Sequence, residues 1–233
     1  MSPTAIPGNL ILKNEMVEAD PFFNNVSLLL HGDGANGSTT IVDSSPSPKT
    51  VAAVGDAQIS TAIADPFGNT TGVIALDGNG DYLNISGGFV NGTEDFTIEW
   101  WEKLSATNID YSVIRFDNQA SSGIKTGGIR VQIYVVGGVN YGSDYTSSTD
   151  WQHIALTRQS GNIRIFASGI LLTPSFNVNE NYSFNLTSFA IGRAWAQFYT
   201  NDFAGYIDEF RITKGVARYT ANFTPPTAPF PAQ

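Results

Sequence analysis

Short runs of alternating apolar and polar residues, separated by turns rich in glycine, asparagine and serine, recur through most of this 233-residue chain. The clearest run is FTIEWWEKL at residues 96–104, in which Phe96, Ile98, Trp100 and Leu104 share one face of an extended strand. Roughly a dozen such segments occur, and no long stretch has helical periodicity. This spacing predicts an all-β sandwich of antiparallel strands.

The composition agrees with strands and loops and argues against several classes of function. Hydrophobic residues make up 42% of the chain, enough for a sizeable core, whereas charged residues make up only 14%. The net charge of -9, without any block of lysine and arginine, argues against binding to nucleic acid or to anionic membranes. The chain has no cysteine, which excludes disulfides and cysteine-based zinc sites.

Residues 1–12 lack a basic segment followed by a long apolar run, so we expect no secretory signal. No apolar stretch approaches the roughly 18 residues that a membrane-spanning helix needs. We therefore expect a protein that is made in the cytoplasm of its host cell and does not enter a membrane.

The two ends of the chain differ from its middle. Residues 1–25 contain three prolines and a single aliphatic cluster at residues 10–12. We predict that they form an arm that docks on another subunit or supports a homo-oligomer. The domain itself is predicted to cover residues 26–233, and four prolines from Pro225 onward predict an extended, surface-lying tail.

The stretch GYIDEFRITKG at residues 205–215 contains a conflict. Strict alternation places Tyr206, Asp208, Phe210 and Ile212 on one face of a strand. Three of these side chains suit a core, but a carboxylate on an apolar face must be paired, hydrogen-bonded or bound to a metal. The partner of Asp208 is therefore the question that this stretch raises.

Several motifs, in order along the chain, resemble those of laminin-G-like, concanavalin A-type domains. They are LLLHGDG at 28–34, TIVDSS at 40–45, LDGNGDYL at 76–83, DFTIEWW at 95–101, WQHIALTR at 151–158 and GYIDEFRI at 205–212. The ending, KGVARY at 214–219 and FTPP at 223–226, is similar to versions that are common in bacteriophage virion proteins.

This resemblance implies a jelly roll of two antiparallel sheets, often one calcium ion near the joined ends, and binding rather than catalysis. Two features depart from the family. Ser168 stands at a hairpin where many members carry aspartate, and the arm lies outside the family's domain. Because a fold does not fix a function, the binding role is an expectation by analogy.

For one structural calcium ion the candidate ligands are Asp33, Asp43 and Asp208. Calcium takes six to eight oxygen ligands, and the glycine-rich loop around Asp33 could add carbonyl groups. The alternative is that Asp208 accepts hydrogen bonds from the backbone or pairs with arginine, while Asp33 and Asp43 make turns. Asp77 and Asp81 form a second acidic turn, which is more typical of side chains that cap a turn.

Exposed aromatic side chains are the candidates for contact with a glycan, because sugars stack their apolar faces on such rings. The candidates are Trp101, Tyr141, Tyr145, Trp195 and Tyr199. Most lie in segments that read as loops, where binding residues concentrate. The alternative is that these rings pack on the core, on the arm or on a neighbouring subunit.

The sequence gives little support to catalysis. Glucanases of this fold present carboxylates as Glu-x-Asp-x-x-Glu along one strand, and the chain has no such run. Glu99 and Glu102 fall on opposite faces by alternation, and His31 and His153 are the only histidines. We therefore expect a protein that is not an enzyme, with a glycoside hydrolase as the least favoured alternative.

Together these expectations describe a bacteriophage virion surface protein, a decoration or tail-fibre component whose lectin-like domain serves attachment. In this role the arm binds other virion subunits. The alternative is a receptor-binding lectin whose loops hold a glycan of the host cell surface.

Overall fold

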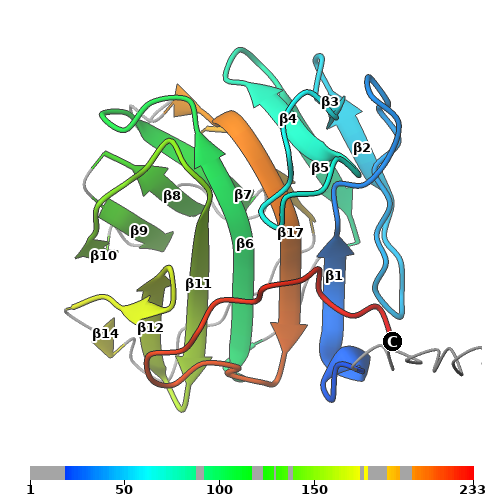
Figure 1. Ribbon diagram of the computed structural model, residues 1–233. Coiled ribbons are helices and arrows are strands. Elements are labelled where there is room, and N and C mark those ends of the chain that lie inside the picture. Colours follow the sequence, from blue (N-terminus) through cyan, green and yellow to red (C-terminus); the bar gives the residue numbers. More distant parts are fainter. Residues whose placement is uncertain are drawn as a thin grey trace, which may run out of the picture.

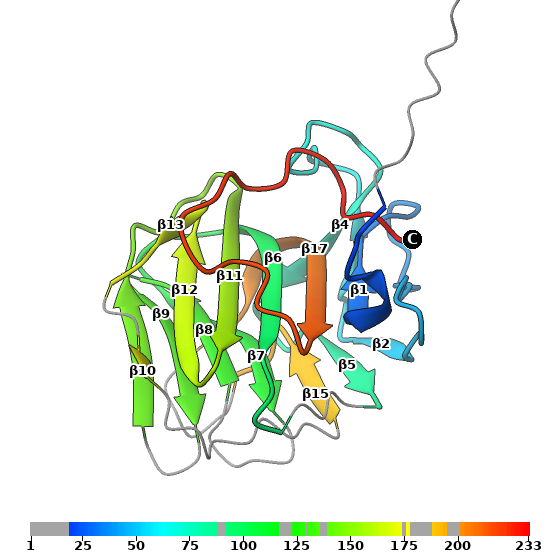
Figure 2. The ribbon, with the colours of Figure 1, turned by 90° about the horizontal axis from the view of Figure 1, so that it is seen from below.

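The computed structural model describes residues 19–87, 92–116, 123–128, 130–135, 139–173, 176–177, 188–194 and 201–233. The alternating segments form two sheets that pack face to face (Figure 1, Figure 2), which confirms the predicted all-β sandwich. The strands of the first sheet are β1 (Val26–Leu30), β3 (Gln58–Ser60), β4 (Val73–Asp77), β6 (Phe96–Leu104), β11 (Gln152–Gln159), β12 (Asn162–Ala167), β13 (Ile170–Leu171), β14 (Phe176–Asn177) and β17 (Ala204–Lys214). Those of the second are β2 (Val51–Val54), β5 (Tyr82–Ser86), β7 (Asp110–Phe116), β8 (Gly123–Gly127), β9 (Arg130–Val135), β10 (Val139–Asp144), β15 (Ser188–Ile191) and β16 (Asn201–Asp202).

The long strand β17, which lies late in the chain, pairs with the first strand β1. The first sheet runs β13-β12-β11-β6-β17-β4-β3, and the second runs β10-β9-β8-β7-β15-β5-β2. One edge of β17 pairs with β6, while its other edge pairs with β4 over its first half and with β1 over its second half. The first and last strands of the domain are therefore neighbours.

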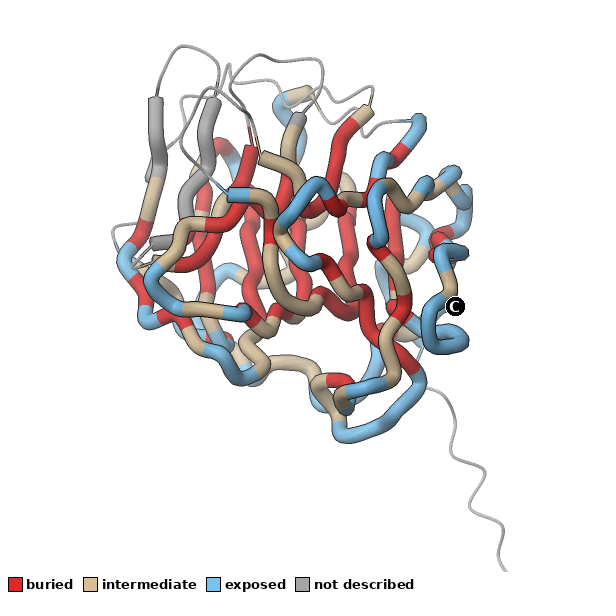
Figure 3. The backbone as a smooth tube through the Cα atoms, turned by 90° about the horizontal axis from the view of Figure 1, so that it is seen from above, coloured by how far each residue is buried: buried red, intermediate tan, exposed pale blue. Residues whose placement is uncertain are grey.

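The core lies between the two sheets, and β6 shows how the alternation builds it. Phe96, Ile98, Trp100 and Leu104 all lie in the core, as predicted. Buried residues follow the strands and exposed residues follow the loops (Figure 3). The face of each sheet that points away from the core is its outer face.

A β-bulge in β17 overturns the predicted side-chain alternation of that strand. The register with β6 shifts between Asp208 and Arg211, and Glu209 has a φ of 48°. The extra residue changes the phase of the strand. As a result Ile207, Phe210 and Ile212 face the core, whereas Asp208 lies on the outer face.

The folded domain begins earlier than residue 26. The backbone N–H of Asp20 donates to the carbonyl of Gln233 (3.0 Å), and a 3₁₀ turn, η1 (Phe23–Asn25), leads into β1. The carboxylate of Asp20 is buried against two arginines that are described below. The predicted boundary at residue 25 is therefore too late, and residues 1–18 of the expected arm lie outside the described residues.

Residues 215–233, here called the strap, cross the outer face of the first sheet (Figure 1). The strap leaves β17 and reaches the β12–β13 turn, where the N–H of Phe223 donates to the carbonyl of Gly169 (2.9 Å). It then returns across the sheet to Asp20. The prediction of an extended tail is confirmed, although Phe230 is buried rather than surface-lying. Within the described residues, no helical segment has the length and apolarity that crossing a membrane requires.

Candidate binding site

The three aspartates predicted to hold calcium do not form one site. Asp43 is buried, and its carboxylate accepts hydrogen bonds at 2.7–2.9 Å from the backbone N–H groups of Leu29, Ser45 and Lys49. Asp33 is exposed, and Asp208 lies buried beneath Gly32. The predicted set is therefore wrong as a shared metal site: the three carboxylates do not come together, and both oxygens of Asp43 accept backbone N–H groups of β1 and of the segment that follows Asp43.

Asp208 follows the alternative that the sequence left open. Its Oδ1 accepts the backbone N–H of Glu209 at 3.0 Å. Burial, together with the charge of Glu209, raises the pKa of Asp208 to about 9, so this carboxyl group carries a proton at neutral pH. The neighbouring Glu209 carboxylate contacts Nδ1 of His31 at 2.8 Å and accepts the N–H of Phe230 at 2.7 Å.

The aromatic residues predicted to contact a glycan differ in how far the structure exposes them. Tyr145 is buried, and its hydroxyl donates to Glu102 (3.3 Å) and accepts the N–H of Gly127 (3.0 Å), so its prediction as an exposed ring is wrong. Trp101 is half-buried between Phe67 and His153, at ring-centroid distances of 5.9 and 5.3 Å. Trp195, Tyr199 and the side chain of Tyr141 lie outside the described residues.

A network of charges lies between the strap and the outer face of the first sheet. Glu99 of β6 is fully buried and accepts two hydrogen bonds from Arg211, at 2.8 and 2.9 Å. Its other oxygen contacts His153 (3.2 Å) and accepts the hydroxyl of Tyr219 (2.8 Å). Asp20 binds both Arg211 and Arg218, at 3.1 and 2.7 Å. Opposite charges are thus matched, as burial requires.

The loop at residues 61–72 covers the next part of this face. Its Phe67 packs edge-on against Trp101, and the carbonyl of Ala64 accepts the indole N–H of Trp151 at 3.0 Å. Asp65 fixes the loop by accepting the N–H groups of Phe67 and Asn69, both at 2.8 Å. The strap and this loop therefore leave only part of the outer face free to meet a ligand.

A pocket of about 300 Å³ opens on the uncovered part of this face, near the end of β4 and the start of β17. Gln58, Ala75 and Tyr206 form one row across three neighbouring strands, since Ala75 pairs with both of the others. All three are half-buried and line the pocket. Ala204 and Gly205 add a floor without long side chains.

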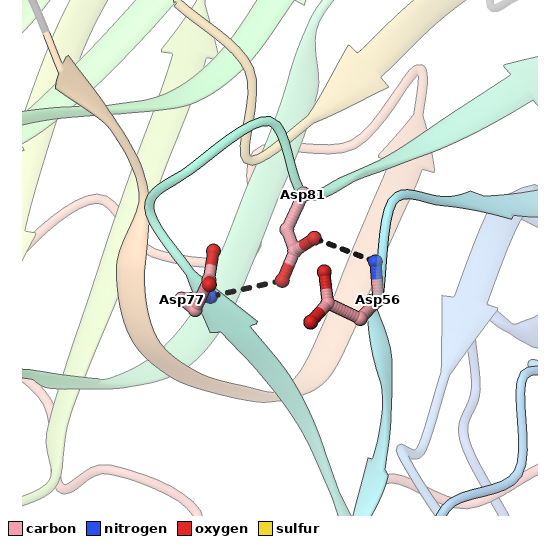
Figure 4. A group of neighbouring side chains, drawn as sticks. All are labelled: Asp56, Asp77 and Asp81. Atoms are coloured by element: carbon pink, nitrogen blue, oxygen red, sulfur yellow. Dashed lines mark hydrogen bonds between the residues drawn. The ribbon is translucent and has the colours of Figure 1, made fainter.

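Three aspartates stand at the rim of this pocket: Asp56, Asp77 and Asp81 (Figure 4). Asp81 is buried and accepts the N–H groups of Asp56 (2.8 Å) and Asp77 (3.1 Å). Asp77 accepts the N–H of Asn79 (2.7 Å), which confirms its predicted role in capping the turn. Burial raises the pKa of Asp81, against the two backbone hydrogen bonds. A proton or a cation would relieve the repulsion among these carboxylates.

A larger hollow of about 640 Å³ lies between the strap and the loop that follows β1. Its walls are mainly the proline, alanine and phenylalanine side chains of residues 226–232, and its polar side chains are His31, Asp33 and Thr227. Because His31 is already engaged by Glu209, this hollow offers a ligand fewer unoccupied polar groups than the pocket beside Tyr206 does.

The sequence also identifies the relationship of the chain to known proteins. No curated protein matches it significantly. A sequence profile described as the Concanavalin A-like lectin/glucanases superfamily matches residues 77–218, more than half of the chain. The chain belongs to the concanavalin A-like superfamily.

Solved structures show the same concanavalin A-like fold. Botulinum neurotoxin type C has a TM-score of 0.61 at 16% identity, over 84% of this chain and 49% of the toxin chain. The binding domain of Paraclostridial mosquitocidal protein 1 has a TM-score of 0.61 at 18% identity, over 83% and 49%. Domain 4 of AbnA, a GH43 extracellular arabinanase from Geobacillus stearothermophilus, solved with arabinotriose, has a TM-score of 0.61 at 18% identity, over 83% and 95%. The chain thus spans about half of the toxin chains, and identities this low indicate the fold alone.

The concanavalin A-like superfamily includes glucanases, so the arrangement of carboxylates matters. Glu99 lies on the outer face under the strap, whereas Glu102 points between the sheets and accepts hydrogen bonds from Trp100 (2.8 Å) and Thr126 (2.9 Å). The sheet itself separates the two groups, which confirms that they point to opposite faces. They therefore cannot act on one glycosidic bond as a pair.

Sequence reasoning missed the pocket row because it assigned Tyr206 to the core face. The bulge after Asp208 places Tyr206 on the outer face instead. The signal that could have identified it is Asp208, since regular alternation placed its carboxylate on an apolar face and a break in the alternation removes that conflict. Gln58 carried no comparable signal, because nothing local indicates which strand lies beside it.

Proposed function

We propose that this chain is a non-enzymatic, lectin-like attachment module of a bacteriophage virion surface protein. The observation that carries the binding role is membership of the concanavalin A-like superfamily with an open pocket on the outer face of one sheet. Proteins of the same fold support it. Cell entry of botulinum neurotoxin type C depends on interaction with two ganglioside molecules, and a neurotoxin binding domain has been solved with rat synaptotagmin II.

The virion context of the proposal rests on the C-terminal motif at residues 214–226, which resembles phage versions of this domain. In the proposed arrangement residues 1–18 bind other virion subunits or a second copy of this chain, and the domain faces outward. The chain enters the fold at Asp20, beside its own C-terminal residue, so both ends leave the sandwich at the same place (Figure 2). The second candidate function is a receptor-binding lectin, which the open pocket favours.

The test is a paired capture experiment with labelled protein. One bait is phage particles stripped of this protein, and the other is host cells. The test variant lacks residues 1–18, because a longer truncation would remove Asp20 and disturb the fold itself. Capture by particles that requires residues 1–18 supports the virion role, and capture by cells that persists without them supports the lectin. Absence of both would overturn the proposal.

The family resemblance also predicts one structural calcium ion. Because the carboxylate of Asp43 already accepts three backbone hydrogen bonds, we propose that the ion is bound without Asp43. Calorimetry on chelator-treated protein tests it: we expect heat on adding calcium and none on adding magnesium. Asp43→Asn should leave this heat unchanged, provided that the variant folds. A titration without heat would remove calcium from the proposal.

A further inference from the structure

The pocket beside Tyr206 is lined by short side chains and one aromatic ring. Ala75 lies between Gln58 and Tyr206 in the cross-strand row, so two longer side chains flank a short one. Gly205 continues the floor, and a side chain there would collide with the carbonyl of Lys103. Ala75 and Gly205 thus line the pocket with little or no side chain, and Tyr206 lines it with an aromatic ring. A ring beside a shallow floor suits a ligand with an apolar face.

The polar groups around this floor suit hydroxyl groups. The Gln58 amide both donates and accepts hydrogen bonds, and the exposed carboxylates of Asp56 and Asp77 accept them. Hydrogen bonds from a hydroxyl to a carboxylate are stronger than those between neutral groups. A ligand with several hydroxyl groups and one apolar face is a pyranose ring.

Charge and size narrow the class of sugar. The lining includes three aspartates, and no lysine or arginine lines the pocket as far as the described chain shows. An anionic sugar would meet repulsion, whereas an uncharged one would not. A volume of about 300 Å³ lies at the small end of the range for ligand pockets, roughly 300–1,000 Å³, and suits one sugar ring rather than an extended chain.

We infer that this pocket binds one uncharged sugar residue of a glycan, with Tyr206 as the stacking surface and with Gln58, Asp56 and Asp77 as hydrogen-bonding partners. The inference rests on the proposed attachment function and gives it a ligand class and a position. It also places the ligand on the first sheet, against a ring that the sequence did not single out for sugar binding.

The test compares two alanine-to-glutamine variants by saturation-transfer NMR. Ala75→Gln fills the pocket, and the matched control Ala52→Gln places the same side chain at an exposed position of β2, on the second sheet. The probes are methyl glycosides of glucose, galactose and mannose, together with N-acetylneuraminic acid and glucuronic acid. We expect at least one methyl glycoside to bind the wild-type protein and Ala52→Gln, and to lose at least about tenfold in affinity for Ala75→Gln.

Gln58→Ala removes the amide without adding volume, so it gives an independent result if Ala75→Gln does not fold. The inference is overturned if no methyl glycoside binds the wild-type protein, if both glutamine variants bind equally, or if the two acids bind better than the uncharged sugars. If capture by cells or particles persists in all three variants, the proposed function stands and only this ligand assignment fails.

Discussion

Glu99 is fully buried and yet ionised. Burial alone would raise its pKa, but the charge of Arg211 and the hydrogen bond from His153 outweigh burial and lower the pKa to about 2. The folded-state pKa lies below the unfolded value of 4.5, so this group stabilises the protein above pH 4.5. Its contribution is lost progressively as the pH falls from 4.5 through about 2.

Removing the charge of Glu99 should destabilise the fold strongly. Glu99→Gln leaves Arg211 buried without its main partner, and we expect a loss of about 3–5 kcal/mol in the free energy of unfolding. The control is Asp150→Asn, which makes the same change from carboxylate to amide in an exposed ion pair. Asp150 Oδ1 lies 3.8 Å from Lys103 Nζ, and we expect its loss to leave the free energy of unfolding almost unchanged. Urea denaturation at pH 7 measures both. Similar values for the two variants would contradict the role assigned to the network.

The pKa of Glu102 is shifted in the opposite direction to that of Glu99. Burial between the sheets raises its pKa to about 7, against hydrogen bonds from Trp100, Thr126 and Tyr145. The folded-state pKa lies above the unfolded value, so the protonated form is favoured in the fold. This contribution is complete below pH 4.5 and is lost as the pH rises through about 7.

Glu102→Gln should therefore flatten the dependence of stability on pH. In the wild-type protein, ionising this group costs up to ~3 kcal/mol between pH 5 and pH 8, and an amide does not ionise. Urea denaturation followed by tryptophan fluorescence at both pH values measures the difference. An unchanged pH dependence in the variant would show that Glu102 does not titrate in this range.

At the scale of the element, the strap depends on a close contact with the β12–β13 turn. Gly169 has a φ of 79°, and a methyl group there would collide with the carbonyl of Phe223. Phe223 and Tyr219 stack on each other at 3.6 Å and pack against Phe166, so a displacement at Gly169 reaches the apolar part of the strap.

Gly169→Ala should loosen the strap. We expect trypsin to cleave after Arg218, which the wild-type fold holds almost fully buried against Asp20. The control is Gly68→Ala, which has a similar positive φ of 88° but no atom within 4 Å of the added methyl group. Equal cleavage of the two variants would mean that backbone strain alone, rather than the contact with Phe223, explains the effect.

At the scale of the whole molecule, residues 19–25 bind the two ends of the chain together. Asp20 holds Arg211 and Arg218, and its N–H reaches Gln233. A protein that begins at residue 19 should therefore melt at the temperature of the full chain. A protein that begins at residue 26 should lose about 3 kcal/mol or more, because both arginines lose a buried partner.

Thermal denaturation of these two truncated proteins and of Asp20→Asn measures this contribution. Asp20→Asn separates the loss of the carboxylate from the loss of the backbone. If the protein that begins at residue 26 were as stable as the full chain, the first sheet would hold the strap without Asp20, and the sequence boundary at residue 25 would be adequate.

The sequence by itself determined the sandwich and the inward face of β6. Those features follow from the direction of successive side chains in a strand, which alternate whatever the neighbouring strand is. The role of Asp77 in its turn was also predictable, because its partner Asn79 is two residues away. Local patterns are sufficient where both partners are close in the sequence.

Only the tertiary structure decided which groups meet across strands. Glu99 and Arg211 are 112 residues apart, and Tyr145 reaches Glu102 from a segment that reads as an exposed loop. The bulge at Asp208 moved Tyr206 from the expected core face to the wall of the pocket. Alternation fixes the face of a side chain only while the register is regular, and it never fixes which strand lies beside it. The candidate site depends on both, which is why it had to be found in the folded chain.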